Sequence, residues 1–85
     1  MRHDGYALFN DASRRFEHHY RIADGSLLLD DHEGARQHLA HMEAALRDAY
    51  RAFIHIPADD EYTHDEDLRM RGAYLRLEDS LKKAL

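Results

Sequence analysis

The stretch ARQHLAHMEAALRDAYRAF, residues 35–53, decides the fold of this chain. Its apolar side chains recur at spacings of four, three, four, three and four residues: Ala35, Leu39, Met42, Leu46, Ala49 and Phe53. An α-helix has about 3.6 residues per turn, so this spacing places all of them on one face of a helix. Because exposed apolar surface is unfavourable in water, a helix with such a face packs it against a neighbour.

Two further apolar stripes with helical spacing lie before and after this one. One contains Phe9, Ala12, Phe16, Tyr20 and Ala23, and the other contains Met70, Tyr74, Leu77, Leu81 and Ala84. We therefore expect helices at about residues 5–23, 31–54 and 64–84. The sequence predicts an all-α fold, a three-helix antiparallel bundle that forms a single helical domain over residues 1–85.

Local signals predict where these helices begin and end. We expect Gly25 to end the first helix, because glycine adopts the left-handed conformation that closes a helix, and residues 26–29 to form a connector. Pro57 cannot continue the second helix, since it lacks the backbone N–H and disfavours helical geometry at the preceding residue. Thr63 stands three residues before Glu66, so we expect the two to form a capping box for the third helix.

The small size of the chain favours assembly. A domain of 85 residues buries only about 60–65% of the surface that its unfolded chain exposes. Because the sequence has no cysteine, disulfides cannot supplement the core, and we expect a homodimer.

Leu68 and Leu75 indicate where two copies would meet. They fall about 140–160° from the main stripe of the third predicted helix. Gly72 lies close to them on the helix and would allow another backbone to approach. We interpret Leu68, Gly72 and Leu75 as an oligomer interface. The alternative is a wide core that wraps around to cover the two leucines.

The charge of the chain limits its partners. A formal charge of −5 opposes direct binding to nucleic acid, because phosphate backbones require clustered positive charge. The sequence shows no signal-peptide core and no run of about 20 apolar residues, so we expect a cytoplasmic protein without membrane contact. The negative charge is compatible with a basic protein partner, and the alternative is that it only keeps the protein in solution.

One acidic segment is the candidate partner-binding site. It consists of Asp59, Asp60, Glu61, Tyr62, Asp65, Glu66 and Asp67. The carboxylates would attract a basic partner, and Tyr62 would anchor it. The segment has no glycine at the position that a calcium-binding EF-hand requires. A solvated linker followed by an acid-rich first helical turn is the alternative interpretation.

The histidines suggest an alternative function. The chain contains eight, and His38 and His41 have the spacing of metal ligands on a helix. These two residues would serve a histidine-rich, metal-binding helical dimer. The other interpretation places the histidines at exposed positions or at the core edge. Protonation of all eight would change the formal charge from −5 to +3, so we expect solubility or oligomeric state to depend on pH between about 5 and 7.

Motifs for catalysis are missing from the sequence. It has no cysteine, no Gly-x-Ser-x-Gly element, no phosphate-binding glycine loop and no dinucleotide fingerprint. We therefore expect no enzyme activity and no cofactor. Our leading hypothesis is a small acidic helical protein that acts by protein–protein interaction. It would be a phage- or plasmid-type regulator or inhibitor of a basic, nucleic-acid-handling partner.

Overall fold

The computed structural model describes residues 4–83, in which three α-helices and one short 3-10 turn follow each other. Helix α1 spans Gly5–Leu28, α2 spans His32–Ala52, the 3-10 turn η1 spans Phe53–His55 and α3 spans Glu61–Lys83. The predicted all-α character and the three predicted helices are confirmed. Ala84, the last residue of the third predicted stripe, lies outside the described residues.

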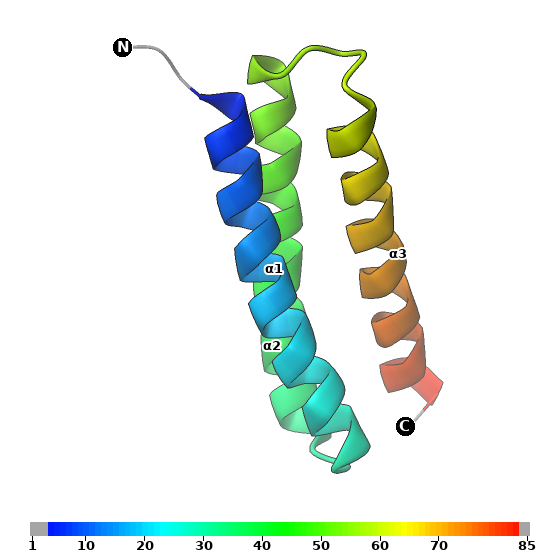
Figure 1. Cartoon of the computed structure of the whole chain (residues 1–85). Helices are drawn as coiled ribbons and strands as arrows, with labels where there is room; N and C mark the ends of the chain where they lie inside the picture. The colour runs from blue at the N-terminus through cyan, green and yellow to red at the C-terminus, as the bar shows by residue number, and fades with distance from the viewer. Residues whose placement is uncertain (1–3, 84–85) are drawn as a thin grey trace.

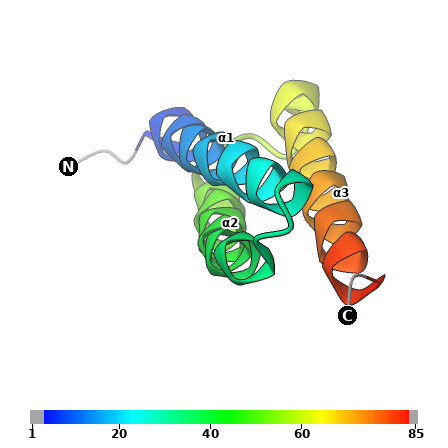
Figure 2. The ribbon, with the colours of Figure 1, turned by 90° about the horizontal axis from the view of Figure 1, so that it is seen from below.

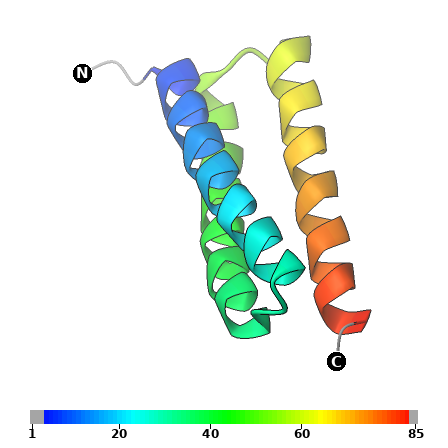
Figure 3. The same cartoon turned by 60° about the horizontal axis from the view of Figure 1, so that its bottom comes forward.

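Helices α1 and α2 form a closely packed hairpin, and α3 lies along the side of this pair (Figure 1). The chain descends through α1, ascends through α2 and descends again through α3 in that view. Seen from below, α3 stands apart from the crossing of α1 and α2 (Figure 2). The tilted view shows the end of α3 near the turn that joins α1 to α2 (Figure 3).

The core lies between α1 and α2 and is completed by α3. Its largest fully buried side chains are Phe9, Phe16, Met42, Met70 and Thr63. Burial of each phenylalanine or methionine contributes about 2–3 kcal/mol. The buried residues of α2 are mostly alanines, namely Ala35, Ala45, Ala49 and Ala52, and side chains this small allow α1 to approach closely.

Gly5 fixes the start of α1 against the end of α2. A Cβ atom on Gly5 would lie 2.6 Å from the carbonyl oxygen of His55 and 2.7 Å from Cγ1 of Ile56. The absence of a side chain at Gly5 therefore lets the first turn of α1 pack against η1 and the residue that follows it. This contact places the beginning of α1 at the same end of the molecule as the connection between α2 and α3.

The predicted end of the first helix is wrong. Gly25 lies inside α1 without a positive φ, and the helix continues to Leu28. The added turn packs Leu27 against the core, and this burial outweighs the tendency of glycine to end a helix. The left-handed residue of the turn is Asp30, whose φ is 59°.

Aspartates cap both α2 and α3. Asp31 caps α2, because its Oδ1 accepts the backbone N–H of Gly34 at 3.0 Å. Asp60 replaces the predicted cap Thr63, since its Oδ1 accepts the N–H of Tyr62 at 3.1 Å. Thr63 lies within α3 and is buried. Helix α2 ends at Ala52 and is followed by η1, so the chain leaves the α-helical conformation before Pro57, as predicted.

Candidate functional site

Four residues of the predicted acidic segment are exposed where α2 connects to α3. They are Asp59, Glu61, Tyr62 and Asp65. The carboxylates of Asp59, Glu61 and Asp65 line a surface hollow of about 420 Å³, together with Ala58 and His64. Tyr62 belongs to the same turn of α3 and is 66% exposed. This end of the molecule therefore combines a concave acidic surface with an accessible aromatic side chain.

Asp60 has a structural role at this end. Its carboxylate caps α3, and its backbone oxygen accepts the Thr63 hydroxyl at 3.2 Å. The Asp60 carboxylate also acts on the Tyr6 hydroxyl and is the main reason why the pKa of Tyr6 is raised. Asp60 thus fastens the start of α3 and faces the first turn of α1, and it is less exposed than its acidic neighbours.

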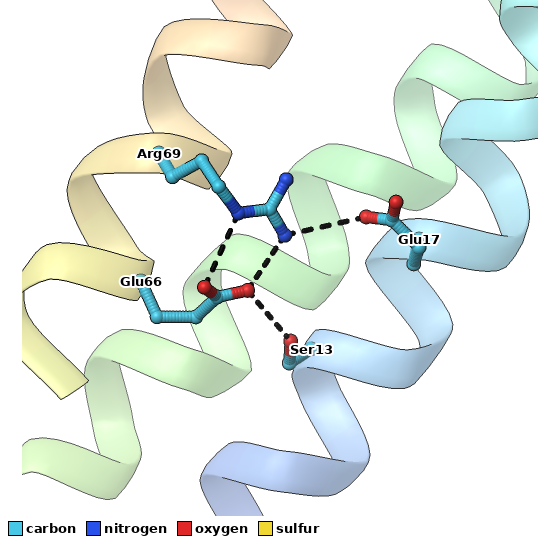
Figure 4. Close-up of polar contacts among 4 residues, drawn as sticks. All are labelled: Ser13, Glu17, Glu66 and Arg69. Carbon is cyan, nitrogen blue, oxygen red and sulfur yellow. Dashed lines mark hydrogen bonds and ion pairs between the residues drawn. The ribbon is translucent and has the colours of Figure 1, made fainter. Parts of the chain in front are cut away.

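Glu66 does not line the hollow and instead joins α3 to α1 (Figure 4). Its carboxylate accepts hydrogen bonds from the Arg69 guanidinium at 2.6 and 3.2 Å and from the Ser13 hydroxyl at 3.4 Å. Arg69 also reaches Glu17 on α1, at 3.4 Å. The bond from Arg69 is the main reason why the pKa of Glu66 is lowered, and the Glu66 carboxylate in turn raises the pKa of Arg69.

Asp67 lies on the inner face of α3, with 6% of its surface exposed. Its Oδ2 forms an ion pair with Arg71, whose Nε lies 2.8 Å away, and its buried Oδ1 has no hydrogen-bond partner. The acidic residues therefore fall into two groups, one exposed and one turned toward the rest of the protein. Asp59, Glu61 and Asp65 face solvent, whereas Glu66 and Asp67 face neighbouring elements.

The predicted oligomer interface is exposed on α3. Leu68 is 65% exposed and Leu75 is 59% exposed, so the core does not wrap around to cover them. A Cβ atom on Gly72 would meet only the flexible side chain of Arg76, whose Nη1 would be 3.2 Å away. Among residues 4–83, nothing else approaches Gly72 closely enough to require a glycine.

A groove lies between α2 and α3. It has a volume of about 390 Å³ and is lined by Glu43, Leu46, Arg47, Tyr50, Arg51 and Arg71. The Arg71 guanidinium lies 5.6 Å from the centre of the Tyr50 ring. Each arginine is paired with a carboxylate, on Glu43, Asp48 or Asp67. Tyr74 sits at the inner side of α3, where burial and its neighbours Glu43 and Glu78 raise its pKa.

The histidine site contains more residues than the predicted pair. His38 and His41 lie on α2 with ring centroids 5.9 Å apart, and His19 from α1 lies against both. The sequence analysis missed His19 because it ended the first helix too early and so misplaced the turn between α1 and α2. Within residues 4–83, no group of three or more His, Cys, Asp or Glu side chains is arranged to hold a metal ion.

Comparisons with known proteins identify no relative of this chain. No protein-family model, no curated protein and no solved structure matches it. In the part of the chain that the structure describes, no helix has the length and apolar character needed to cross a bilayer.

Proposed function

We propose that this protein acts by binding another protein through its acidic end. The observation that carries the proposal is the hollow lined by Asp59, Glu61 and Asp65, with the exposed Tyr62 in the same helical turn. An arginine or lysine side chain entering the hollow would meet several carboxylates at once. Tyr62 would contribute apolar contact area beside that charge pair.

The partner is a protein with a basic surface. The formal charge of −5 on the chain would steer such a partner toward it, and the steering would weaken as salt is added. Many nucleic-acid-handling proteins carry basic surfaces that bind phosphate backbones. A small acidic helical protein that covers such a surface would act as a regulator or inhibitor, as in phage- or plasmid-type systems.

The proposed assembly is a homodimer of antiparallel three-helix bundles. It rests on the exposed Leu68 and Leu75, which flank Gly72 on the outer face of α3. Together with the small core, this face favours a second copy of the chain as its cover. A dimer would also present two acidic ends, so that a partner with two basic sites would bind more tightly.

The alternative of a metal-binding helical dimer has less support. His38 and His41 are close in space and His19 lies against both, but among the described residues no three such side chains are arranged to hold a metal ion. A stable zinc site commonly uses three or four protein ligands. We therefore keep protein binding as the proposed function.

A binding titration with a defined probe tests this proposal. The probe is an arginine-rich peptide that also carries leucine, and its affinity for the whole chain is measured at low and high salt. Replacement of Asp59, Glu61 and Asp65 by serine removes the hollow's charges. We expect this variant to bind about tenfold more weakly at low salt, since each exposed ion pair contributes about 0.5 kcal/mol.

A matched control separates the hollow from general charge. Asp24, Glu33 and Asp79 are exposed acidic residues outside the hollow, and their replacement by serine removes the same number of charges. We expect that control to bind within about twofold of the unmodified chain at equal salt. Equal losses of affinity in the two variants would contradict a specific acidic site.

A further inference from the structure

Four histidines gather where α1 packs against α2. His18 and His19 come from α1, and His38 and His41 come from α2. The His19 ring lies at the centre of the group, with centroid distances of 5.0 Å to His18, 5.1 Å to His38 and 4.5 Å to His41. His19 and His38 are partly buried, so the group belongs to the contact between the two helices.

The contact between His19 and His38 limits how many protons the group can hold. Their Nδ1 atoms are 2.8 Å apart, which is a hydrogen-bond distance. One Nδ1 must carry the hydrogen and the other must offer its lone pair. The pair can keep this bond with both rings neutral or with one ring charged. When both rings are protonated, two N–H groups face each other and the bond is lost.

The surroundings of the group add to this effect. The charged or titratable groups that act on His19 are His18 and Arg15 on α1 and His38 and His41 on α2. Each of them is positive when protonated, so every added proton raises the repulsion. Arg15 is itself paired with Asp11 and Asp48. From α3, two charged side chains contact α1: Glu66 bonds to Ser13, and Arg69 bonds to Glu17.

The stacked His19 and His41 rings also disfavour a state in which both rings are protonated. Their planes are inclined by only 17°, so the two rings lie nearly face to face. Neutral imidazoles can stack in this way, whereas two imidazolium ions repel each other across the short distance. We infer that His18, His19, His38 and His41 form an acid-sensitive clamp, which holds α1 against α2 at neutral pH and loosens as the pH falls from about 7 to about 5.

The sign of the effect follows from proton linkage. Burial, followed by the neighbouring His41, His38 and His18, lowers the pKa of His19 in the folded protein. The unfolded chain therefore binds more protons at His19 in mildly acidic solution. The stabilising contribution is fully present above the unfolded pKa of about 6.5 and decreases as the pH falls below it.

Urea unfolding at pH 7.5 and pH 5.0 tests the clamp in the whole chain. His19→Phe keeps a flat ring in the stack but removes the titrating nitrogens. We expect acid to lower the urea midpoint of the unmodified protein, and this drop to be at least halved in His19→Phe. His64→Gln is the matched control, because His64 stacks on Phe53 away from the group, and this variant should keep the full drop. An undiminished drop in His19→Phe would overturn the proposal.

A second measurement does not depend on the variant folding. NMR titration of the unmodified protein follows the ring signals of each histidine as acid is added. We expect His19 to protonate below the ordinary histidine pKa of about 6.5, and the ring signals of His38 and His41 to respond in the same pH range. If His19 titrates at the ordinary histidine pKa without any response from the neighbouring rings, the clamp does not exist.

Discussion

Asp67 lies on the buried face of α3, although the sequence analysis placed it in the acidic partner-binding segment. It lies between the buried Thr63 and Met70, and 6% of its surface is exposed. Only one of its carboxylate oxygens is paired, in an ion pair with the Arg71 guanidinium. A buried oxygen without a hydrogen-bond partner costs about 1–3 kcal/mol. The position therefore carries an uncompensated cost that an apolar side chain of similar size would remove.

Replacement of Asp67 by leucine should stabilise the fold. The Arg71 side chain is 46% exposed, so water can solvate it after the ion pair is lost. We expect Asp67→Leu to increase the free energy of unfolding by about 1 kcal/mol, as the unpaired oxygen disappears. Urea denaturation measures the change. Asp79→Leu, at an exposed position on the same helix, should change stability by less than about 0.5 kcal/mol. A lower stability for Asp67→Leu would show that the carboxylate is needed.

Helix α3 is joined to α1 by polar contacts as well as by the apolar core. Glu66 and Arg69 contribute the polar links from α3 to Ser13 and Glu17 (Figure 4). The pKa of Glu66 is lowered, chiefly by its hydrogen bond from Arg69. Its stabilising contribution is therefore present above the unfolded pKa of about 4.5 and is lost as the pH falls through the lower, folded value.

Replacement of Glu66 by glutamine should reduce this acid sensitivity. The amide cannot titrate, so the variant loses about 1 kcal/mol at pH 7 but less below pH 4. Unfolding midpoints at pH 7 and pH 3.5 measure the difference. Glu33→Gln is the control, since the Glu33 side chain is 78% exposed and its nearest cation is 3.9 Å away. If Glu66→Gln and Glu33→Gln show the same pH dependence, the link between α3 and α1 does not control stability.

The sequence predicted the helices well and some of their boundaries less well. The stripes of α1, α2 and α3 depend on burial, and periodicity reports burial directly. Helix ends depend on capping and on local conformational preferences, whose free energies are smaller than those of core packing. Gly25 continues α1 because Leu27 reaches the core, and Thr63 lies inside α3 because Asp60 caps it one turn earlier. The meeting of His19 with His38 could not be predicted without the correct turn between α1 and α2.

On the scale of the whole molecule, the exposed groups divide into separate surfaces. The acidic hollow lies at the connection between α2 and α3, and the leucine face follows the outer side of α3. The exposure of Leu68 and Leu75 was predictable, because helical geometry alone separates them from the main stripe. The division of the acidic segment was less predictable, because Glu66 and Asp67 turn inward only where α3 meets its neighbours.

Gly72 distinguishes a lone chain from the proposed dimer. In the single chain, a methyl group at Gly72 meets only the movable end of Arg76, and alanine favours a helix over glycine by about 1 kcal/mol. Gly72→Ala should therefore raise the stability of the monomer, measured by urea unfolding at low concentration. If two α3 helices approach at Gly72, the same methyl group should weaken the dimer about tenfold, measured by sedimentation equilibrium.

Ser80→Ala, at an exposed position near the end of α3, should leave the dissociation constant unchanged. A monomeric unmodified chain at high concentration, or equal dissociation constants for the unmodified chain and Gly72→Ala, would show that the outer face of α3 is not where two copies meet.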